Sequence, residues 1–271
     1  VIRTLLYLLG AAITAGLIVT IYAFLIFSPE EVSELFNAMT PAYTASFALW
    51  FALVVATINL ALEVERVLGH GNLWRLFTGR YRKPRIEQRI FLFMDLKGST
   101  ALTETLGNEL FSELLQECYQ DLTDVVLKYD ASVHQYVGDE VVMSWPSGTN
   151  GDNVRASVMA SFEYQDQLLA KKGSYEERFG VMPDFRAGID VGPVTIIEVG
   201  DVKRQIVYHG DVLNTAARLL ELCKKRGEDL VVSHPVGSQM QTDSGVRTSW
   251  HGEVSLRGKK VPVKAFALQP A

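Results

Sequence analysis

The sequence contains few cysteines and has no excess of positive charge. Only Cys118 and Cys223 occur among its 271 residues, and they form no C-x-x-C pair. This scarcity argues against a disulfide framework and against a structural zinc site. The formal net charge of −5 at pH 7 argues against nucleic acid as the main partner, although a small anion needs only local positive charge.

Charged side chains are also missing from two long stretches near the N-terminus. Residues 5–27 and residues 43–62 contain no Asp, Glu, Lys or Arg. A helix needs about 20 apolar residues to cross a bilayer core of roughly 30 Å, so each stretch predicts a transmembrane helix. The first stretch is longer than the apolar core of a signal peptide. We therefore predict a membrane anchor over residues 1–62.

The charges around these two stretches predict their orientation. The connection over 28–42 carries three glutamates and no Lys or Arg, whereas basic residues are frequent over 63–88. The positive-inside rule places this basic segment and everything after it in the cytoplasm. Pro84 ends any helix that continues from the membrane. We expect a multi-pass protein of the cell (inner) membrane, with a basic juxtamembrane linker over 63–88 and a cytoplasmic domain over 89–271.

Hydrophobic periodicity in the cytoplasmic domain predicts alternating strands and helices. We expect strands over 89–95, 132–137, 140–145, 185–190, 194–199, 205–208 and 230–233, followed by a β-rich tail. Helices are expected between them, over 101–128, 154–171 and 213–225. Gly107 interrupts the first helix, Gly138-Asp139 is a two-residue hairpin signal, and Gly192-Pro193 separates two strands. The order βαββαβ with extra strands is typical of a ferredoxin-like α+β sandwich.

Two aspartates in this pattern are candidate metal ligands. Asp95 ends the first strand and precedes a turn that opens a helix, and Asp139 lies at the tip of the next hairpin. If the two strands are neighbours, both carboxylates approach one point beside a helix N-terminus, which favours phosphate. Two carboxylates and phosphate oxygens are a usual set of ligands for Mg²⁺. Taken alone, an Asp before a turn is more often a helix cap, and Gly-Asp in a hairpin is more often ordinary turn chemistry.

A later helix adds two polar side chains on one face. Asn214 and Arg218 are four residues apart, so they lie one above the other on that helix. The planar guanidinium of arginine matches the geometry of a phosphate group. Alone, this pair would favour a solvated helix surface over a binding site.

Together, these motifs resemble those of the class III adenylate and guanylate cyclases. The segment FMDLKGST over 93–100 resembles their first metal motif, and VGD over 137–139 resembles the second. The segment GDVLNTAARL over 210–219 is similar to their transition-state helix, and LRGK over 256–259 to the strand that supplies a phosphate-binding lysine. The motifs follow the family order from residue 90 to residue 268. The resemblance implies a cyclase catalytic domain over 89–271.

The resemblance also implies a mechanism. Asp95 and Asp139, assisted by the backbone carbonyl of Leu96, would hold two Mg²⁺ or Mn²⁺ ions while the ribose 3′-hydroxyl attacks the α-phosphate and pyrophosphate leaves. Arg218 would stabilise the charge on the α-phosphoryl group, and Asn214 would hold the ribose. The residues implied to bind phosphate are Gly98, Ser99, Thr100 and Lys259.

The active site of this family forms between two catalytic domains, so a single domain that carries both halves implies a symmetric homodimer. Gln135 stands where adenylate cyclases usually carry a base-recognising Lys, and Val207 where they carry Asp or Thr. Guanylate cyclases commonly place Glu and Cys there. We predict an adenylate cyclase that converts ATP to cyclic AMP. The alternatives are a guanylate cyclase (GTP as substrate) or one of relaxed specificity, and a nucleotide-binding regulatory domain of weak activity.

Overall fold

The computed structural model describes residues 14, 25, 28, 30, 31, 34, 41–68, 79–148, 151–202, 204–254 and 261–271. These residues belong to two compact units, Val1–Leu73 and Trp74–Ala271. Each unit is described by itself below.

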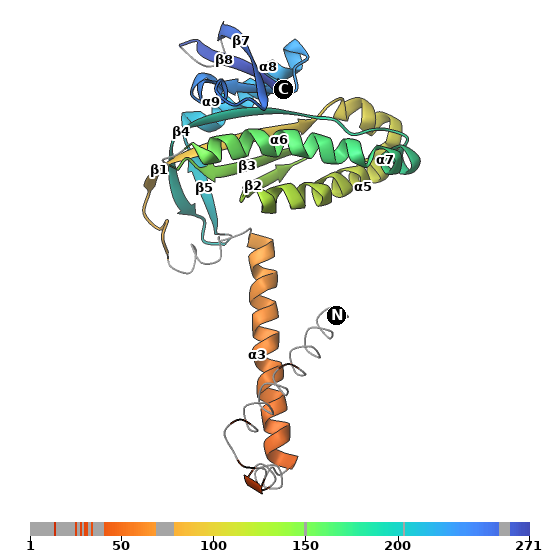
Figure 1. Cartoon of the computed structure of the whole chain (residues 1–271), viewed down its shortest axis with the longest axis vertical. Helices are drawn as coiled ribbons and strands as arrows, with labels where there is room; N and C mark the ends of the chain where they lie inside the picture. The colour runs from red at the N-terminus through yellow and green to blue at the C-terminus, as the bar shows by residue number, and fades with distance from the viewer. Residues whose placement is uncertain are drawn as a thin grey trace. The chain divides into compact units, whose positions relative to one another are not determined.

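The N-terminal unit contains one long apolar helix, α3 (Pro41–Leu68) (Figure 1). Its segment Ala45–Val64 has a mean hydropathy of 2.0 and is long and apolar enough to cross a membrane. Most side chains of this segment are exposed, and the polar Thr57 and Asn59 donate hydrogen bonds of 2.8 Å to carbonyls one turn earlier in the helix. A polar side chain in the hydrocarbon core of a bilayer requires such a hydrogen bond within its own helix. Among the described residues this is the one candidate span; the first predicted helix, over 5–27, lies outside them except for two positions.

The C-terminal unit is built on one eight-stranded sheet with the order β2-β3-β1-β4-β6-β8-β7, and β5 pairs with β4. The strands are β1 (Arg85–Leu96), β2 (Ser132–Val137), β3 (Glu140–Pro146), β4 (Phe185–Val199), β5 (Gln205–His209), β6 (Leu230–Ser233), β7 (Val246–Val254) and β8 (Val263–Pro270). The helices are α5 (Ser99–Lys128), α6 (Asp152–Ala170), α7 (Lys172–Phe179), α8 (Asp211–Arg226) and α9 (His234–Met240). All pairings are antiparallel except that of β4 with β6. The predicted α+β class is confirmed.

The central strand β1 is buried on both faces, as its continuous apolar run predicts. Ile90, Leu92 and Met94 pack into a core with helices α5, α6, α7 and α9, whereas Phe91 and Phe93 pack into a second core with α8. This division follows from the two-residue period of a strand, which sends successive side chains to opposite faces. The sheet therefore lies between α8 on one face and the other helices on the opposite face, where α5, α6 and α7 are visible in Figure 1.

A glycine in β4 sets how closely α8 approaches the sheet. A Cβ atom at Gly188 would lie 2.4 Å from both the carbonyl oxygen of Ala216 and the amide nitrogen of Leu220. Only hydrogen fits at this distance, so the backbone of α8 rests directly on the backbone of β4. This contact fixes the position of the helix that carries Asn214 and Arg218.

One strand prediction is wrong. Residues 185–199 form a single strand rather than two strands divided at Gly192-Pro193. A Cβ atom at Gly192 would lie 2.8 Å from the Cγ2 atom of Val212, so this glycine makes room for the start of α8. Pro193 is opposite Gln88 of β1, and among the described residues the other edge of β4 has no strand partner over 190–194. The missing proline N–H therefore removes no hydrogen bond on that edge.

Candidate active site

The pairing of three strands brings the two predicted carboxylates together. Asp95 is the next-to-last residue of β1, where it lies opposite Glu140 of β3 and Arg186 of β4. Asp139 directly precedes Glu140 in the β2–β3 turn, and Gly138 takes the positive φ of 60° that this turn requires. The predicted hairpin is thus confirmed, and its tip lies beside the end of β1.

Asp95 is almost completely buried, with 4% of its surface exposed. Burial raises the pKa of its carboxyl group, and the charge of Asp139 raises it further, against the opposing effects of Lys224 and Arg186. The pKa of Glu140 is raised by its own burial and then by the charge of Asp95. Three carboxyl groups therefore repel one another at the end of β1, an arrangement that a bound cation would relieve.

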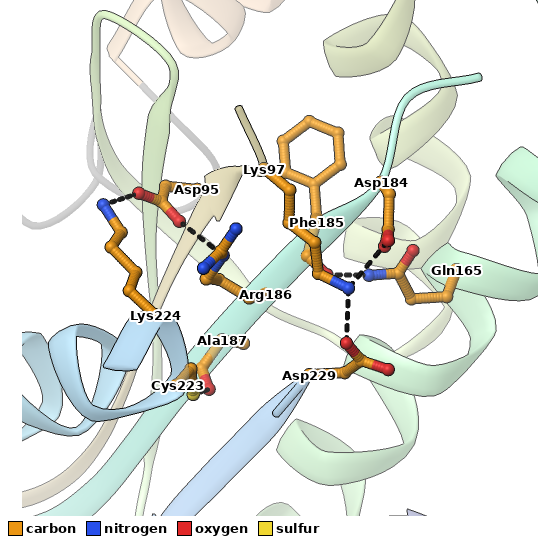
Figure 2. Close-up of polar contacts among 10 residues, drawn as sticks. All are labelled: Asp95, Lys97, Gln165, Asp184, Phe185, Arg186, Ala187, Cys223, Lys224 and Asp229. Carbon is orange, nitrogen blue, oxygen red and sulfur yellow. Dashed lines mark hydrogen bonds and ion pairs between the residues drawn. The ribbon is translucent and has the colours of Figure 1, made fainter. Parts of the chain in front are cut away.

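Each carboxylate oxygen of Asp95 faces a basic side chain, Lys224 on one side and Arg186 on the other (Figure 2). Its Oδ2 atom forms an ion pair with Nζ of Lys224 on α8. Its Oδ1 atom is buried and accepts no hydrogen bond, and Nε of Arg186 lies 3.8 Å away. A buried carboxylate oxygen without a hydrogen-bond donor is costly, so it suits a metal ligand.

The donor atoms fit Mg²⁺ or Mn²⁺ better than a metal enclosed by protein side chains. No three His, Cys, Asp or Glu side chains within the described ranges are placed to hold a metal ion together. Mg²⁺ typically takes one or two carboxylates and completes its coordination with substrate phosphates and water. Asp95 and Asp139 supply such a pair, and the buried Leu96 is the next residue after Asp95.

The predicted phosphate-binding turn follows directly. Gly98 adopts a left-handed conformation with φ of 69° and precedes α5, which begins at Ser99, two residues before its predicted start. The first N–H groups of a helix lack acceptors within the helix, and they attract anions. Gly98, Ser99 and Thr100 therefore lie at a helix N-terminus close to Asp95 in the chain. Because the Gly107 backbone is non-helical, the predicted interruption of this helix is confirmed.

Lys97 anchors this turn to the rest of the sheet. Its ammonium group contacts Asp184, at 2.7 Å, and Asp229, as Figure 2 shows. Its backbone N–H also donates to the carbonyl of Asp184 at 2.8 Å. Partial burial acts to lower the pKa of Lys97, but the two aspartates outweigh it and the pKa is raised. The residues after Asp95 are thus tied to the starts of β4 and β6.

Tyr119 supports the hairpin that carries Asp139, a role that the sequence pattern did not indicate. This residue lies on α5, and its hydroxyl donates a hydrogen bond of 3.1 Å to the carbonyl of Gly138. Its ring also packs 4.5 Å from the ring of Tyr136 on β2, measured between centroids. Helix α5, which begins four residues after Asp95, therefore holds the turn that contains Asp139.

The two predicted transition-state residues both lie on α8. Asn214 is exposed, and Arg218 is half-buried and forms an ion pair with Glu221 on the same helix. Within the described part of the chain, neither residue makes a hydrogen bond or ion pair with Asp95 or Asp139. Lys259 lies outside the described residues.

The two positions predicted to recognise the base lie on different strands. Gln135 is exposed on β2, and Val207 is half-buried on β5 opposite Ile197. Their neighbours connect the strands, because the rings of His134 and Tyr208 pack edge to face at 4.9 Å between centroids. Burial lowers the pKa of His134, and the nearby Arg89 lowers it further. A neutral imidazole thus lies next to the exposed Gln135.

Comparison with known proteins agrees with this geometry. The family model described as the adenylate and guanylate cyclase catalytic domain matches residues 82–270. The chain belongs to this family. The resemblance in the sequence motifs is therefore confirmed.

Adenylate cyclase 2 of Rhizobium meliloti (strain 1021) is 34% identical over 233 residues, which cover 86% of this chain and 63% of that protein. The chain thus spans less than two thirds of this cyclase relative. The adenylyl cyclase CyaB from P. aeruginosa has a similar fold, with a TM-score of 0.62 at 22% identity, over 70% of this chain and 97% of that one. The guanylate cyclase domain of RhGC from Catenaria anguillulae, crystallised with GTP, has a TM-score of 0.58 at 16% identity, over 69% and 98%.

Proposed function

We propose that this chain is an adenylate cyclase that converts ATP to cyclic AMP and pyrophosphate. The observation that carries the proposal is the pair of carboxylates at the end of β1, where Asp95 keeps a buried oxygen without a hydrogen-bond donor beside Asp139. The same turn presents the N-terminus of α5, which favours a phosphate group. These features match the needs of a nucleotide triphosphate held with divalent cations.

Asp95 and Asp139, with the carbonyl oxygen of Leu96, would hold two Mg²⁺ or Mn²⁺ ions. When bound, these ions supply positive charge to the phosphate oxygens and make the ribose 3′-hydroxyl more acidic. The amide groups at Gly98, Ser99 and Thr100 would orient the phosphates. Burial of Asp95 within the sheet excludes water from its carboxylate and strengthens its interaction with a cation.

Asn214 and Arg218 would act on a nucleotide held by the aspartates of a second copy of this chain. Asn214 is exposed and Arg218 half-buried on one face of α8, so both can reach a partner molecule. The guanidinium of Arg218 would stabilise the negative charge that develops on the α-phosphoryl group, and the amide of Asn214 would orient the ribose. A symmetric homodimer with two sites satisfies this requirement, because each chain then supplies both halves.

The preference for ATP rests on the 34% identical relative named as an adenylate cyclase. Gln135 offers both a donor and an acceptor and can hydrogen-bond to either purine, whereas Val207 can only pack against a base. We also propose that the apolar segment Ala45–Val64 anchors the chain in the cell (inner) membrane. With the basic residues that follow it, this segment would place the catalytic domain in the cytoplasm.

The test is an assay of the purified full chain with ATP and with GTP in the presence of Mn²⁺, compared with the D139N variant. We expect cyclic AMP from the wild type and a loss of about 100-fold or more in D139N, because a metal-binding charge is removed. D139N should keep its thermal unfolding temperature, since Asp139 lies in the β2–β3 turn and is only half-buried.

The outcomes separate the alternatives. If cyclic GMP were the main product, the substrate would be GTP rather than ATP. Binding of nucleotide without any cyclic product would indicate a regulatory domain. Full activity in D139N would exclude the two-metal assignment.

A further inference from the structure

The last turns of α8 contain three consecutive basic residues, and one of them points at the metal site. Lys224 forms an ion pair with Oδ2 of Asp95, whereas Lys225 has no ion pair with Asp95. A basic run at a helix C-terminus is usual because it opposes the helix dipole. The contact of Lys224 with a buried carboxylate is a separate feature that the dipole does not explain.

The two partners of this ion pair differ greatly in exposure. The side chain of Asp95 is 6% exposed, whereas that of Lys224 is 50% exposed. A half-exposed lysine with a flexible stem can leave its partner without opening a cavity or unfolding a turn. Arg186 on the other side of Asp95 is 16% exposed and is held within the sheet. Lys224 is therefore the cation that can move when another cation arrives.

The charges at the end of β1 explain why a cation is needed there in the absence of a metal ion. Asp95 lies opposite Glu140 in the pairing of β1 with β3, and Asp139 is the residue before Glu140, so three acidic side chains gather at the end of β1. Like charges in a partly buried site destabilise the fold unless a positive charge balances them. The ammonium of Lys224 provides this balance, but it occupies Oδ2 of Asp95, the oxygen that a second divalent ion would need once the first is held by Oδ1.

We propose that Lys224 is an internal counter-ion that occupies the metal site of the metal-free protein and must be displaced by a divalent cation. This inference rests on the proposed function, because that proposal assigns Asp95 as a metal ligand. The protein thereby remains folded without metal, and its metal affinity is lower than Asp95 and Asp139 alone would give. Helix α8 then affects the site in two ways, through Arg218 towards a partner chain and through Lys224 towards its own aspartate.

The test measures Mn²⁺ binding to the full-length protein in detergent, without nucleotide, by the loss of the electron paramagnetic resonance signal of free Mn²⁺. We compare the wild type with K224M, K224Q, K225M and D95N. K225M removes the same charge from the neighbouring residue, so it is the control for the general change in electrostatic potential at the site. We expect K224M and K224Q to lower the Kd for Mn²⁺ about fivefold relative to K225M, as is typical for removing a partly exposed ion pair. D95N should abolish binding at the site.

A second readout is independent of affinity. In metal-free protein, the Lys224 amine is engaged by Asp95 and should react slowly with an acylating reagent, as measured by mass spectrometry of peptides. Addition of Mn²⁺ should increase labelling of Lys224, while that of Lys225 stays constant.

Two results would overturn the inference while leaving the metal site in place. In the first, D95N loses Mn²⁺ binding, but K224M and K224Q bind no more tightly than K225M. In the second, both Lys224 variants bind Mn²⁺ more weakly, which would make Lys224 a supporting residue of the metal site. Unchanged Mn²⁺ binding in D95N would overturn both the inference and the metal assignment of the proposed function. Two substitutions at Lys224 guard against misfolding of either one.

Discussion

The contact between Gly188 and α8 allows a sharp prediction, because it links packing in the sheet to the position of the helix that carries Asn214 and Arg218. Replacing Gly188 by Ala adds a Cβ atom 2.4 Å from two backbone atoms of α8. Neither is the end of a flexible side chain, so the helix itself must shift by about 1 Å to reach an ordinary contact distance. Asn214 and Arg218 move with it.

The expected magnitude follows from that shift. Overpacking of this kind costs about 3 kcal/mol, which lowers the Tm of a unit of this size by roughly 6–12 °C. A displacement of about 1 Å in a catalytic group can reduce the rate about 100-fold. G188A should therefore unfold earlier and lose most cyclase activity even at temperatures where it remains folded.

The assay is thermal unfolding of the full chain by circular dichroism, together with the rate of cyclic nucleotide formation well below the Tm. The matched control is G173A in α7, where a Cβ atom meets nothing within 4 Å. Alanine in that helix should stabilise the protein by about 0.5–1 kcal/mol and leave activity unchanged. If G188A had the Tm and activity of the wild type, α8 would not rest on β4 as described.

Two further predictions concern the carboxylates and their support. The pKa of Asp95 is raised in the folded state, so ionising this carboxyl group lowers the free energy of unfolding. The lost stability is regained as the pH falls from the folded-state pKa to the lower, unfolded-state pKa. D95N should thus unfold at a higher temperature than the wild type at pH 7 in a chelator, with the difference vanishing in acid; a lower Tm at pH 7 would contradict the assigned shift. Y119F removes the hydrogen bond to the Gly138 carbonyl. It should cost about 1 kcal/mol or less and raise the Mn²⁺ concentration needed for activity several-fold. The control Y129F loses a hydrogen bond to Glu163 on α6 instead of one to the β2–β3 turn, and should leave the Mn²⁺ requirement unchanged. Equal Mn²⁺ requirements in the two variants would refute a role for Tyr119.

The local elements of the catalytic domain could be predicted from the order of its residues. Apolar runs and turn residues were sufficient to predict β1, the β2–β3 hairpin, the interrupted α5 and the end of α8 to within one residue. The motifs around Asp95, Asp139 and Arg218 were likewise visible, because each lies within a short segment. Such features depend on neighbours a few residues away, which any single chain displays.

Which side chains meet depends on how the elements pack in three dimensions. Lys224 and Lys225 are adjacent lysines in the sequence, and the packing of α8 on β4 selects the one that contacts Asp95. The sequence showed Gly192-Pro193 as a strand break, although Gly192 serves to admit Val212. Register and helix placement arise from contacts between segments far apart in the chain. Periodicity within one segment carries no information about these contacts, so they had to be seen in the folded structure.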